Sequence, residues 1–529
     1  MQIIPLFLFL CSLPPQDSTG RVLHELERQL KCQASEGVDR YFHPEFEGTG
    51  FLSPPPHEIR QEKLGSVTVR SWTEKKSKPA DSVLTLNQFF RDVASVTDAR
   101  LKTLKVNGNG GIIKLVITGI RPSGARFHRK DVYSIEWKES GKNGWRIFRL
   151  HRKKGRWVES PRLLFRDGTD SLGLRLPVEV EREDLPVFME PFSFLGGIAA
   201  GDYDRDGDLD LYVPRIGKNL LFRNEGGRFV KDGAVPDADV GASALFVDLD
   251  NDGWLDLLLA NVASKNMPGK RVGRALAWYR NLGNGKFEDR TKASGLETRG
   301  PAMSLSASDV DRDGDLDFHV CFYKDFGETS ENDYIPLPDN ILQADNGVAN
   351  QLWINQGDGT FREEAAKRGL ADRGWSFAAA FADYDNDGDP DLTVANDFGK
   401  NRLYRNRGDG SFEDVTGKSG ASDAGFGMGV SWGDIDGDGR LDMHVSNMYS
   451  TAGNRLLTAK DDPRLLKMAR GNTLLRNSGG GSFEDVSGKA GVGHSGWAWS
   501  NSFLDYNSDG HPDLYVANGY MTGESRYDL

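Results

Sequence analysis

One acidic pattern, Asp-x-Asp-x-Asp-Gly-x-x-Asp, recurs six times in the last two-thirds of the chain. The copies, called loops 1 to 6, begin at Asp202, Asp248, Asp309, Asp383, Asp434 and Asp505. The glycine at position 6 of each copy tolerates positive φ, so it permits a tight curl of the backbone. Carboxylates crowded into such a curl repel one another when no cation lies among them. The repeated pattern therefore indicates loops that fold around metal ions.

Calcium is the ion that this pattern favours, because calcium takes six to eight oxygen ligands in loose geometry. Position 7 varies among Asp, Trp, Arg and His, so any ligand common to that position is the backbone carbonyl. The sequence predicts up to six Ca²⁺, bound through positions 1, 3, 5 and 9. These residues are Asp202, Asp204, Asp206 and Asp210; Asp248, Asp250, Asp252 and Asp256; Asp309, Asp311, Asp313 and Asp317; Asp383, Asp385, Asp387 and Asp391; Asp434, Asp436, Asp438 and Asp442; and Asp505, Asn507, Asp509 and Asp513.

An EF-hand shares positions 1, 3, 5 and the glycine, but it requires a bidentate Glu at position 12. Position 12 is Val or Leu in all six copies and lies in an apolar stretch such as LDLYV. Each loop is therefore expected to lead into a β-strand, which excludes the EF-hand. The remaining alternative is a set of solvated Asp-Gly turns without an ion, and six copies in register favour the calcium interpretation.

The net charge of −12 agrees with this interpretation, since six Ca²⁺ would add the same amount of positive charge. The acidity then reflects metal sites, and it argues against nucleic acid as a partner, because a phosphate-binding surface is basic. The three cysteines do not form a disulfide framework.

Residues 1–19 are expected to be a signal peptide. They contain the apolar run MQIIPLFLFLCSL, which is too short to span a bilayer. The run lacks a preceding Lys or Arg and a clean cleavage site, so a buried N-terminal segment is the alternative. No other membrane-spanning candidate occurs in the sequence. We therefore expect a secreted, periplasmic or cell-surface protein.

Each loop belongs to a longer repeat over residues 161–529. A segment of the form Phe-x-Asp-x-Thr-x-x-x-Gly precedes the loop, as in FEDVTGKSGA from Phe412, and a turn such as LYRNRGDGSF follows it. Asn-x-Gly-x-Gly between apolar runs is a hairpin signal. We expect a unit of four strands: the Phe strand, the strand entering the loop, the strand leaving it and the hairpin strand. Repeated four-stranded units predict a mainly β fold, a β-propeller. Six units are counted, so the propeller is expected to have six or seven blades.

The repeats differ in length between the strand leaving the loop and the hairpin strand. Extra residues occur there at 262–276, 324–349 and 449–471. Because they occupy the same connection each time, they are expected to lie on one face of the propeller. Insertions that share a face often form a binding surface. The hypothesis is that this face binds the partner.

The motif pair GDYDRDGDLDLYV and LYRNRGDGSFEDVT resembles the FG-GAP/VCBS repeat proteins, particularly the bacterial relatives of cartilage acidic protein, and more distantly the integrin α-subunit propeller. The resemblance covers residues 165–529. It implies an exported calcium-binding propeller, commonly seven-bladed, that serves adhesion or recognition. The chain departs from that pattern in its count of six units.

Residues 20–160 are expected to form a separate α+β domain. Apolar residues at helical spacing predict an amphipathic helix over 21–43. The segment FHPEFEGTGF is then expected to turn the chain, and strands are predicted at 99–106, 111–120, 126–139 and 144–150. A long helix followed by a curved antiparallel sheet resembles the cone of nuclear transport factor 2-like proteins. Such cones can hold a ligand, and His43, Glu45 and His128 are candidates for a polar pocket, with an ordinary surface or turn position as the alternative.

The sequence leads to two functional hypotheses. The first is a recognition or adhesion module with structural calcium, whose partner is a protein or a glycan and whose oligomeric state is open. The alternative is a secreted enzyme, for example one that degrades polysaccharides, with its site on the inserted face or in the N-terminal cone. No catalytic or cofactor-binding residues are assigned. The tripeptide Arg407-Gly408-Asp409 is interpreted as a hairpin turn, because sibling repeats place Gly and Asp in the same slot.

Overall fold

The structure is a computed structural model. It describes residues 23, 26–28, 30, 42–48, 60–64, 67–73, 89, 93–107, 110–139, 145–161, 167–174, 197–215, 219–233, 240–263, 274–324, 340, 342–449, 468, 470–493 and 495–518. The predicted signal peptide at 1–19 lies outside the described residues. In the described part of the chain, no helix combines the length and the apolar character needed to cross a bilayer.

The chain divides into two compact units, Met1–Asp167 and Gly168–Leu529. Unit 1 contains a sheet in which the strands are ordered β2-β3-β7-β6-β5-β4, with β1 paired parallel to β7. The strands are β1 (Phe42–Gly48), β2 (Arg60–Leu64), β3 (Val67–Thr73), β4 (Ser95–Asn107), β5 (Gly110–Ile120), β6 (Arg126–Glu139) and β7 (Trp145–Ser160). Each of the four predicted strands falls in β4 to β7, although β7 continues ten residues beyond the predicted end.

The core of unit 1 lies between this sheet and helical residues near the N-terminus. Leu23, Leu26 and Leu30 are helical and buried against the sheet, in agreement with their predicted helical spacing. The predicted turn at FHPEFEGTGF is wrong for residues 42–48, which form β1. Phe42 is buried in the same core, and its burial favours extended pairing with β7 over a turn.

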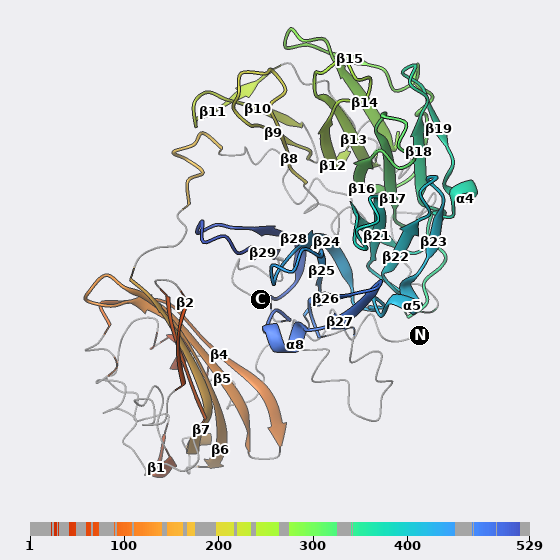
Figure 1. Cartoon of the computed structure of the whole chain (residues 1–529). Helices are drawn as coiled ribbons and strands as arrows, with labels where there is room; N and C mark the ends of the chain where they lie inside the picture. The colour runs from red at the N-terminus through yellow and green to blue at the C-terminus, as the bar shows by residue number, and fades with distance from the viewer. Residues whose placement is uncertain are drawn as a thin grey trace, which may run out of the picture. The chain divides into compact units, whose positions relative to one another are not determined.

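Within its described residues, unit 2 contains five four-stranded antiparallel sheets and one two-stranded sheet (Figure 1). The sheets, called blades 1 to 6, are β8 (Ala199–Gly201), β9 (Asp210–Val213), β10 (Leu220–Asn224) and β11 (Phe229–Asp232); β12 (Val240–Val247), β13 (Asp256–Ala263), β14 (Leu276–Asn281) and β15 (Phe287–Asp289); β16 (Ala302–Ser308), β17 (Asp317–Phe322), β18 (Gln351–Asn355) and β19 (Phe361–Glu363); β20 (Ser376–Ala382), β21 (Asp391–Asn396), β22 (Arg402–Asn406) and β23 (Phe412–Asp414); β24 (Gly427–Gly433), β25 (Asp442–Asn447), β26 (Thr473–Gly479) and β27 (Ser482–Asp485); and β28 (Ala498–Leu504) and β29 (Asp513–Asn518). The first strand of each blade lies against the first strand of the next. The predicted mainly β propeller is confirmed.

The blades begin one strand later than the sequence suggested. The unit was expected to start with its Phe strand, but each Phe strand is instead the fourth strand of the preceding sheet, as β15 pairs with β14. The reason is the tight Asn-x-Gly-x-Gly turn, which makes the Phe strand pair with the hairpin strand before it. A blade therefore runs from the strand entering a loop to the next Phe strand.

Short helices explain the glycine of the Phe-x-Asp-x-Thr-x-x-x-Gly segment. Helices α4 (Ala365–Arg368), α5 (Thr416–Ser419) and α8 (Ser487–Ala490) follow the Phe strands of blades 3, 4 and 5. Each ends at a glycine in the left-handed region, with φ of 86°, 76° and 72°. Glycine is the residue that adopts this helix C-cap without a steric penalty.

The antiparallel order places the acidic loops and the insertions at opposite ends of the blades. Each loop joins the first strand to the second, and the hairpin turn joins the third to the fourth, so both lie at one end. The three insertions each join the second strand to the third, and therefore emerge at the other end. The prediction that the insertions share one connection is confirmed.

Candidate metal centre

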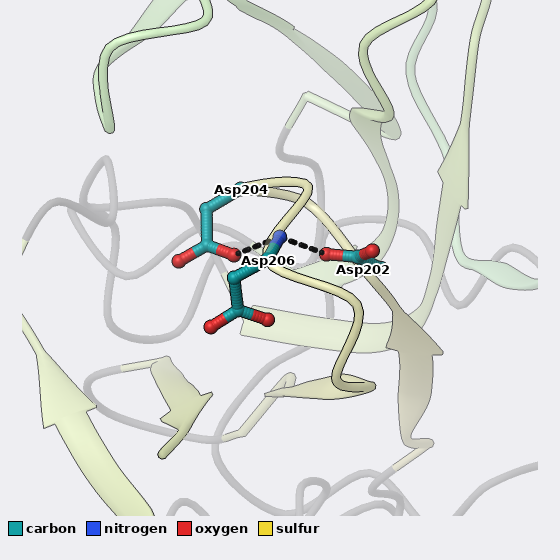
Figure 2. A group of neighbouring side chains, drawn as sticks. All are labelled: Asp202, Asp204 and Asp206. Carbon is teal, nitrogen blue, oxygen red and sulfur yellow. Dashed lines mark hydrogen bonds between the residues drawn. The ribbon is translucent and has the colours of Figure 1, made fainter. Parts of the chain in front are cut away.

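Each acidic loop is curled by hydrogen bonds from its own backbone. In loop 1, the carboxylate of Asp202 accepts the N–H of Asp206 at 3.1 Å (Figure 2). It also accepts the N–H of Gly207 at 3.1 Å. Asp206 in turn accepts the N–H of Asp208 at 2.9 Å. The residue at position 4 has φ between 55° and 60° in five loops, and loop 5 has Gly437 there. The glycine at position 6 also has positive φ, as the sequence predicted.

The curl brings three carboxylates together in loops 1 to 5. One oxygen from each lies within 4.8 Å of the others in the groups Asp202, Asp204 and Asp206; Asp248, Asp250 and Asp256; Asp309, Asp311 and Asp317; Asp383, Asp385 and Asp391; and Asp434, Asp436 and Asp442. Positions 1, 3 and 9 thus converge in loops 2 to 5, whereas in loop 1 position 5 takes the place of position 9. Among the described residues, loop 6 forms no such group of carboxylates, and Asn507 leaves it with one carboxylate fewer.

The carboxylate at position 9 ties the loop to the blade. In loop 3, Asp317 is fully buried and accepts the N–H of Val310 at 3.0 Å and that of Asn355 at 2.8 Å. Burial raises the pKa of this carboxyl to about 7, against the hydrogen bonds that favour its charged form. The pKa of the equivalent residue is raised to about 6 in Asp210, about 7 in Asp256 and about 8 in Asp391, each mainly by burial.

Several loop carboxylates have a buried oxygen that receives no hydrogen bond. In loops 2 to 4, the oxygens of this kind at positions 1 and 3 are the Oδ1 atoms of Asp248, Asp250, Asp311 and Asp385. Asp389 Oδ1 at position 7 of loop 4 and Asp513 Oδ2 at position 9 of loop 6 also lack a hydrogen bond. A buried acceptor without a partner costs about 1–3 kcal/mol, and more when it carries charge. The repeated orphaned oxygens fit a cation at the point where the three carboxylates meet.

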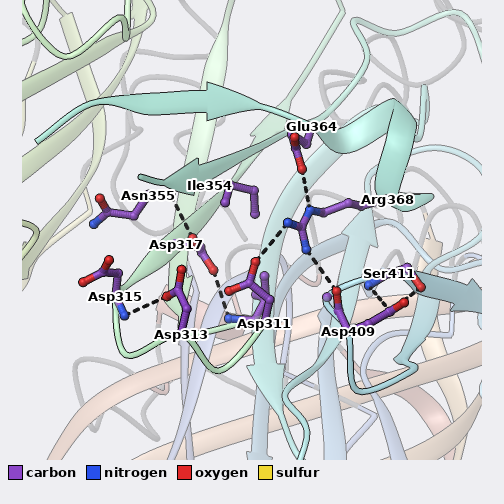
Figure 3. A network of polar contacts seen from close by, with 12 residues as sticks. Asp311, Asp313, Asp315, Asp317, Ile354, Asn355, Glu364, Arg368, Asp409 and Ser411 are labelled. Atoms are coloured by element: carbon purple, nitrogen blue, oxygen red, sulfur yellow. Dashed lines mark hydrogen bonds and ion pairs between the residues drawn. The ribbon is translucent and has the colours of Figure 1, made fainter. Parts of the chain in front are cut away.

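Arginines from neighbouring segments contact the outer side of the loops. Arg280 of β14 pairs with Asp252 at 2.9 Å and also contacts Asp250. Arg368 of α4 pairs with Asp311 at 2.9 Å and with Glu364 at 2.8 Å (Figure 3). These cations offset part of the acidic charge, but the Oδ1 atoms of Asp250 and Asp311 still receive no hydrogen bond.

The sequence reasoning missed the asparagine that ends the hairpin strand. Asn281, Asn355, Asn406 and Asn477 are each 1–3% exposed. In each, the backbone N–H binds the position 9 carboxylate, and the side-chain amide reaches a carbonyl of the preceding loop. This asparagine recurs before every hairpin turn, and that recurrence could have indicated a shared role. The preference of asparagine for turns, however, already explained its position locally.

The tripeptide Arg407-Gly408-Asp409 forms the hairpin turn expected of it. The carboxylate of Asp409 accepts the N–H of Ser411 at 2.9 Å and its hydroxyl at 2.6 Å. The carbonyl of Asp409 accepts a hydrogen bond from Arg368 (Figure 3). The side chain of Asp409 therefore closes its own turn.

Two pockets lie at the insertion end of the blades, at equivalent positions in blades 3 and 5. The first has a volume of about 540 Å³ and includes Lys324, Asn346, Glu363 and Arg373 in its lining. The second has a volume of about 320 Å³ and includes Tyr449, Arg470, Asp423 and Asp485. The lining of the first pocket thus includes residues at both ends of the insertion 324–349, and that of the second includes residues at both ends of the insertion 449–471.

The polar candidates in unit 1 are His43, Glu45 and His128. His128 is exposed on β6, which is the ordinary surface position weighed for it, and the side chains of His43 and Glu45 lie outside the described residues. The opposite face of the sheet instead buries Arg129, Asp131 and Arg152. Arg129 pairs with Asp131 at 2.7 Å, and Tyr133 donates a hydrogen bond to the same carboxylate at 3.0 Å. The alternation of side chains along β6 could have indicated this buried pair, because Arg129 and Asp131 lie on the same face of the strand as Tyr133.

Comparison with known proteins agrees with the repeat. Cartilage acidic protein 1 of Homo sapiens is 25% identical over 346 residues, which cover 61% of this chain and 47% of that protein. The Xenopus tropicalis protein of the same name is 25% identical over 272 residues, covering 47% of this chain and 40% of that one. The chain thus spans less than half the length of these relatives.

One similar solved structure is that of an Agrocybe aegerita lectin, described as recognising non-reducing terminal N-acetylglucosamine. The match covers 80% of this chain and 86% of the lectin chain. Its TM-score is 0.33 and its identity 16%, so the likeness bears on neither fold nor ligand.

The FG-GAP-like repeat family matches five stretches, which coincide with the acidic loops and the strands around them. The stretches are residues 202–259, 262–320, 337–394, 383–445 and 465–516. Together they span more than half of the chain, and on this evidence the chain belongs to the FG-GAP-like repeat family.

Proposed function

We propose that the chain is an exported recognition module, secreted, periplasmic or at the cell surface, whose propeller is held in shape by Ca²⁺ in its acidic loops. The observation that carries the proposal is the convergence of three carboxylates in loops 1 to 5, together with orphaned buried oxygens in loops 2, 3 and 4. A structural ion at each loop would satisfy those oxygens and join the strand entering the loop to the strand leaving it.

The donor set favours calcium over other ions. The converging atoms are carboxylate oxygens, without thiolate or imidazole, which suits calcium, magnesium or manganese and not zinc. The loops combine side-chain and backbone oxygens in an irregular curl, and calcium accepts such geometry whereas magnesium demands a near-ideal octahedron. Weak calcium loops are filled in extracellular settings, where dissociation constants on the order of 10⁻⁴–10⁻³ M suffice.

The residues of each loop have separate roles in this proposal. Positions 1 and 3 supply carboxylate oxygens, and position 9 supplies one while its hydrogen bonds hold the loop against the blade. In loop 1, Asp206 of position 5 takes the place of position 9 in the converging group. Calcium bound to the folded loop alone would add its binding free energy to the stability of the propeller.

We further propose that the partner, a protein or a glycan, binds at the insertion end. The pockets of blades 3 and 5 support this, since ligand pockets commonly have volumes of about 300–1,000 Å³ and both include charged side chains. The lining of the blade 3 pocket includes two cations, Lys324 and Arg373, and one carboxylate, Glu363. This chemistry suits hydroxyl-rich or acidic ligands.

A glycan array tests the recognition site. The full chain is expected to bind array sugars in calcium and to lose binding in a chelator. The double variant Lys324→Ala/Arg373→Ala is expected to lose most of the binding, while Lys286→Ala, at a hairpin turn of the loop end, retains it. Equal binding by the two variants would place recognition elsewhere. Release of new reducing ends from the array sugars would support the secreted enzyme instead.

A further inference from the structure

A buried asparagine bridges each pair of consecutive acidic loops from loop 1 to loop 5. The side-chain amide of Asn355, in blade 3, donates one hydrogen bond to the carbonyl of Leu249 in loop 2 at 2.9 Å. It donates another to the carbonyl of Leu316 in its own loop 3 at 3.3 Å. Its carbonyl oxygen accepts the N–H of Gly357 at 3.1 Å, so the amide is fully engaged. The side chain therefore fixes two loops relative to each other.

The same bridge recurs at three other blade junctions. The amide reaches position 2 of the preceding loop in every case, at Tyr203 from Asn281 (2.8 Å), at Val310 from Asn406 (2.8 Å) and at Tyr384 from Asn477 (2.7 Å). It also reaches position 8 of its own loop in every case, at 3.0, 3.3 and 3.2 Å.

The bridge connects one candidate ligand to the next through two residues. Asp256 of loop 2 accepts the N–H of Leu249 at 3.3 Å, and the carbonyl of Leu249 accepts the amide of Asn355. The backbone N–H of Asn355 then binds Asp317 of loop 3 at 2.8 Å (Figure 3). A shift of either carboxylate toward an ion is thus transmitted to the other loop along a continuous line of hydrogen bonds.

A second link joins the same loops at their exposed edge. The side chain at position 4 of one loop contacts positions 6 or 7 of the next. Asn251 donates to Asp315 at 2.6 Å, Arg312 pairs with Asp389 at 2.5 Å, and Asn386 donates to the carbonyl of Gly439 at 3.2 Å. Arg205 lies over the ring of Trp254, with 4.5 Å to its centroid. Loop 5 has Gly437 at position 4, which has no side chain to continue the series.

We infer that the loops bind calcium cooperatively, with the hairpin asparagines as the positioning residues that couple them. The inference rests on the proposed calcium binding. An ion in one loop orders its position 2 peptide and position 9 carboxylate. Through the asparagine, that order is already present in the neighbouring loop when its own ion arrives. The ordering cost of the second ion is thereby reduced, which is positive cooperativity.

The test is a calcium titration of the full chain in competition with a chromophoric chelator at fixed ionic strength. The wild-type isotherm is expected to have a Hill coefficient above one. Asn355→Ala is expected to lower that coefficient and to weaken calcium binding by about 5- to 100-fold at the affected loops. Near-UV circular dichroism at saturating calcium checks that the variant retains its fold.

Asn224→Ala is the matched control. Asn224 occupies the same hairpin position in blade 1, binds Asp210 through its backbone N–H at 2.8 Å and reaches Leu209 of its own loop at 3.1 Å. Loop 1 is the first acidic loop in the sequence. In the described part of the chain, the side-chain amide of Asn224 donates to its own loop, so this variant loses the link to that loop alone. It is expected to keep the wild-type Hill coefficient. Arg312→Ala, at an exposed site, removes an outer link without altering the core and is expected to lower the coefficient less than Asn355→Ala.

The outcomes separate this inference from the proposal beneath it. If the wild-type chain binds no calcium, the proposed function fails. If calcium binds with a Hill coefficient of one, or if Asn355→Ala and Arg312→Ala both titrate like the wild type, the coupling is overturned while calcium binding stands.

Discussion

At the scale of single residues, the loops place acidic groups where a carboxylate without a cation is costly. Asp385 is an example, because its Oδ1 is buried without a hydrogen bond and burial raises its pKa. The sequence predicted that positions 1, 3, 5 and 9 hold an ion, and this stays a prediction, although positions 1, 3 and 9 lie together in loops 2 to 5. It did not anticipate that position 5 would turn toward the backbone N–H of position 7, as in Asp387.

Asp385→Ala is expected to remove one ion from the chain, because loop 4 loses the position 3 ligand. The bound calcium per chain, measured by mass spectrometry of the metal after gel filtration, should fall by one. Asp409→Ala is the control, since that carboxylate is exposed and closes its own turn. An unchanged calcium count in Asp385→Ala would show that loop 4 is not a site.

The buried pair of Tyr323 and Asp397 predicts a pH dependence away from the loops. Tyr323 donates a hydrogen bond to Asp397 at 2.5 Å, and burial raises the pKa of this carboxyl to about 6. Because the folded-state pKa exceeds the ordinary value of 3.8, the folded chain holds the proton more tightly, and its stability falls as the pH rises from about 4 to 6.

Asp397→Asn keeps an acceptor for Tyr323 and removes the charge. It is expected to stabilise the propeller at pH 7 by about 1–3 kcal/mol and to have little effect at pH 4. Chemical denaturation at the two pH values measures the difference. If Asp397→Asn is as stable as the wild type at both pH values, the burial of a charged carboxylate at this position is contradicted.

At the scale of elements, the sequence predicted strands and loops well but misplaced the start of each blade. The hairpin turn already required the Phe strand to pair backwards, yet the motif order suggested that the Phe strand opens the unit. The hairpin asparagines were missed for a different reason. Their bridging partners lie 78 to 106 residues away in sequence, where no local pattern can indicate them.

The glycine of the Phe-x-Asp-x-Thr-x-x-x-Gly segment is predicted to be required by its backbone conformation. Gly420 has φ of 76°, and a Cβ there would meet the carbonyl oxygen of Phe483 at 2.9 Å. Gly420→Ala is therefore expected to lower the free energy of unfolding by about 1–2 kcal/mol. Gly417→Ala, three residues earlier in open space, should be neutral or stabilise by about 0.4–1 kcal/mol. Equal effects in urea denaturation would contradict the role of Gly420 as a helix cap.

At the scale of the propeller, two ends of each blade are assigned to two tasks. The loop end carries the acidic groups and the bridges between blades, and the insertion end carries the pockets. The sequence predicted that the insertions share one face, because they occupy the same connection of the repeat. It could not predict the pockets, whose lining combines residues at the insertion ends, such as Lys324, with residues after a Phe strand, such as Arg373.

The thermal stability of the full chain in calcium and in chelator tests the central claim most directly. If the loops hold structural calcium, the melting temperature should rise with calcium concentration and fall in excess chelator, because several ions bind to the folded state alone. Magnesium at the same concentration should restore little of the loss. A melting temperature that is the same in calcium and in chelator would contradict the account.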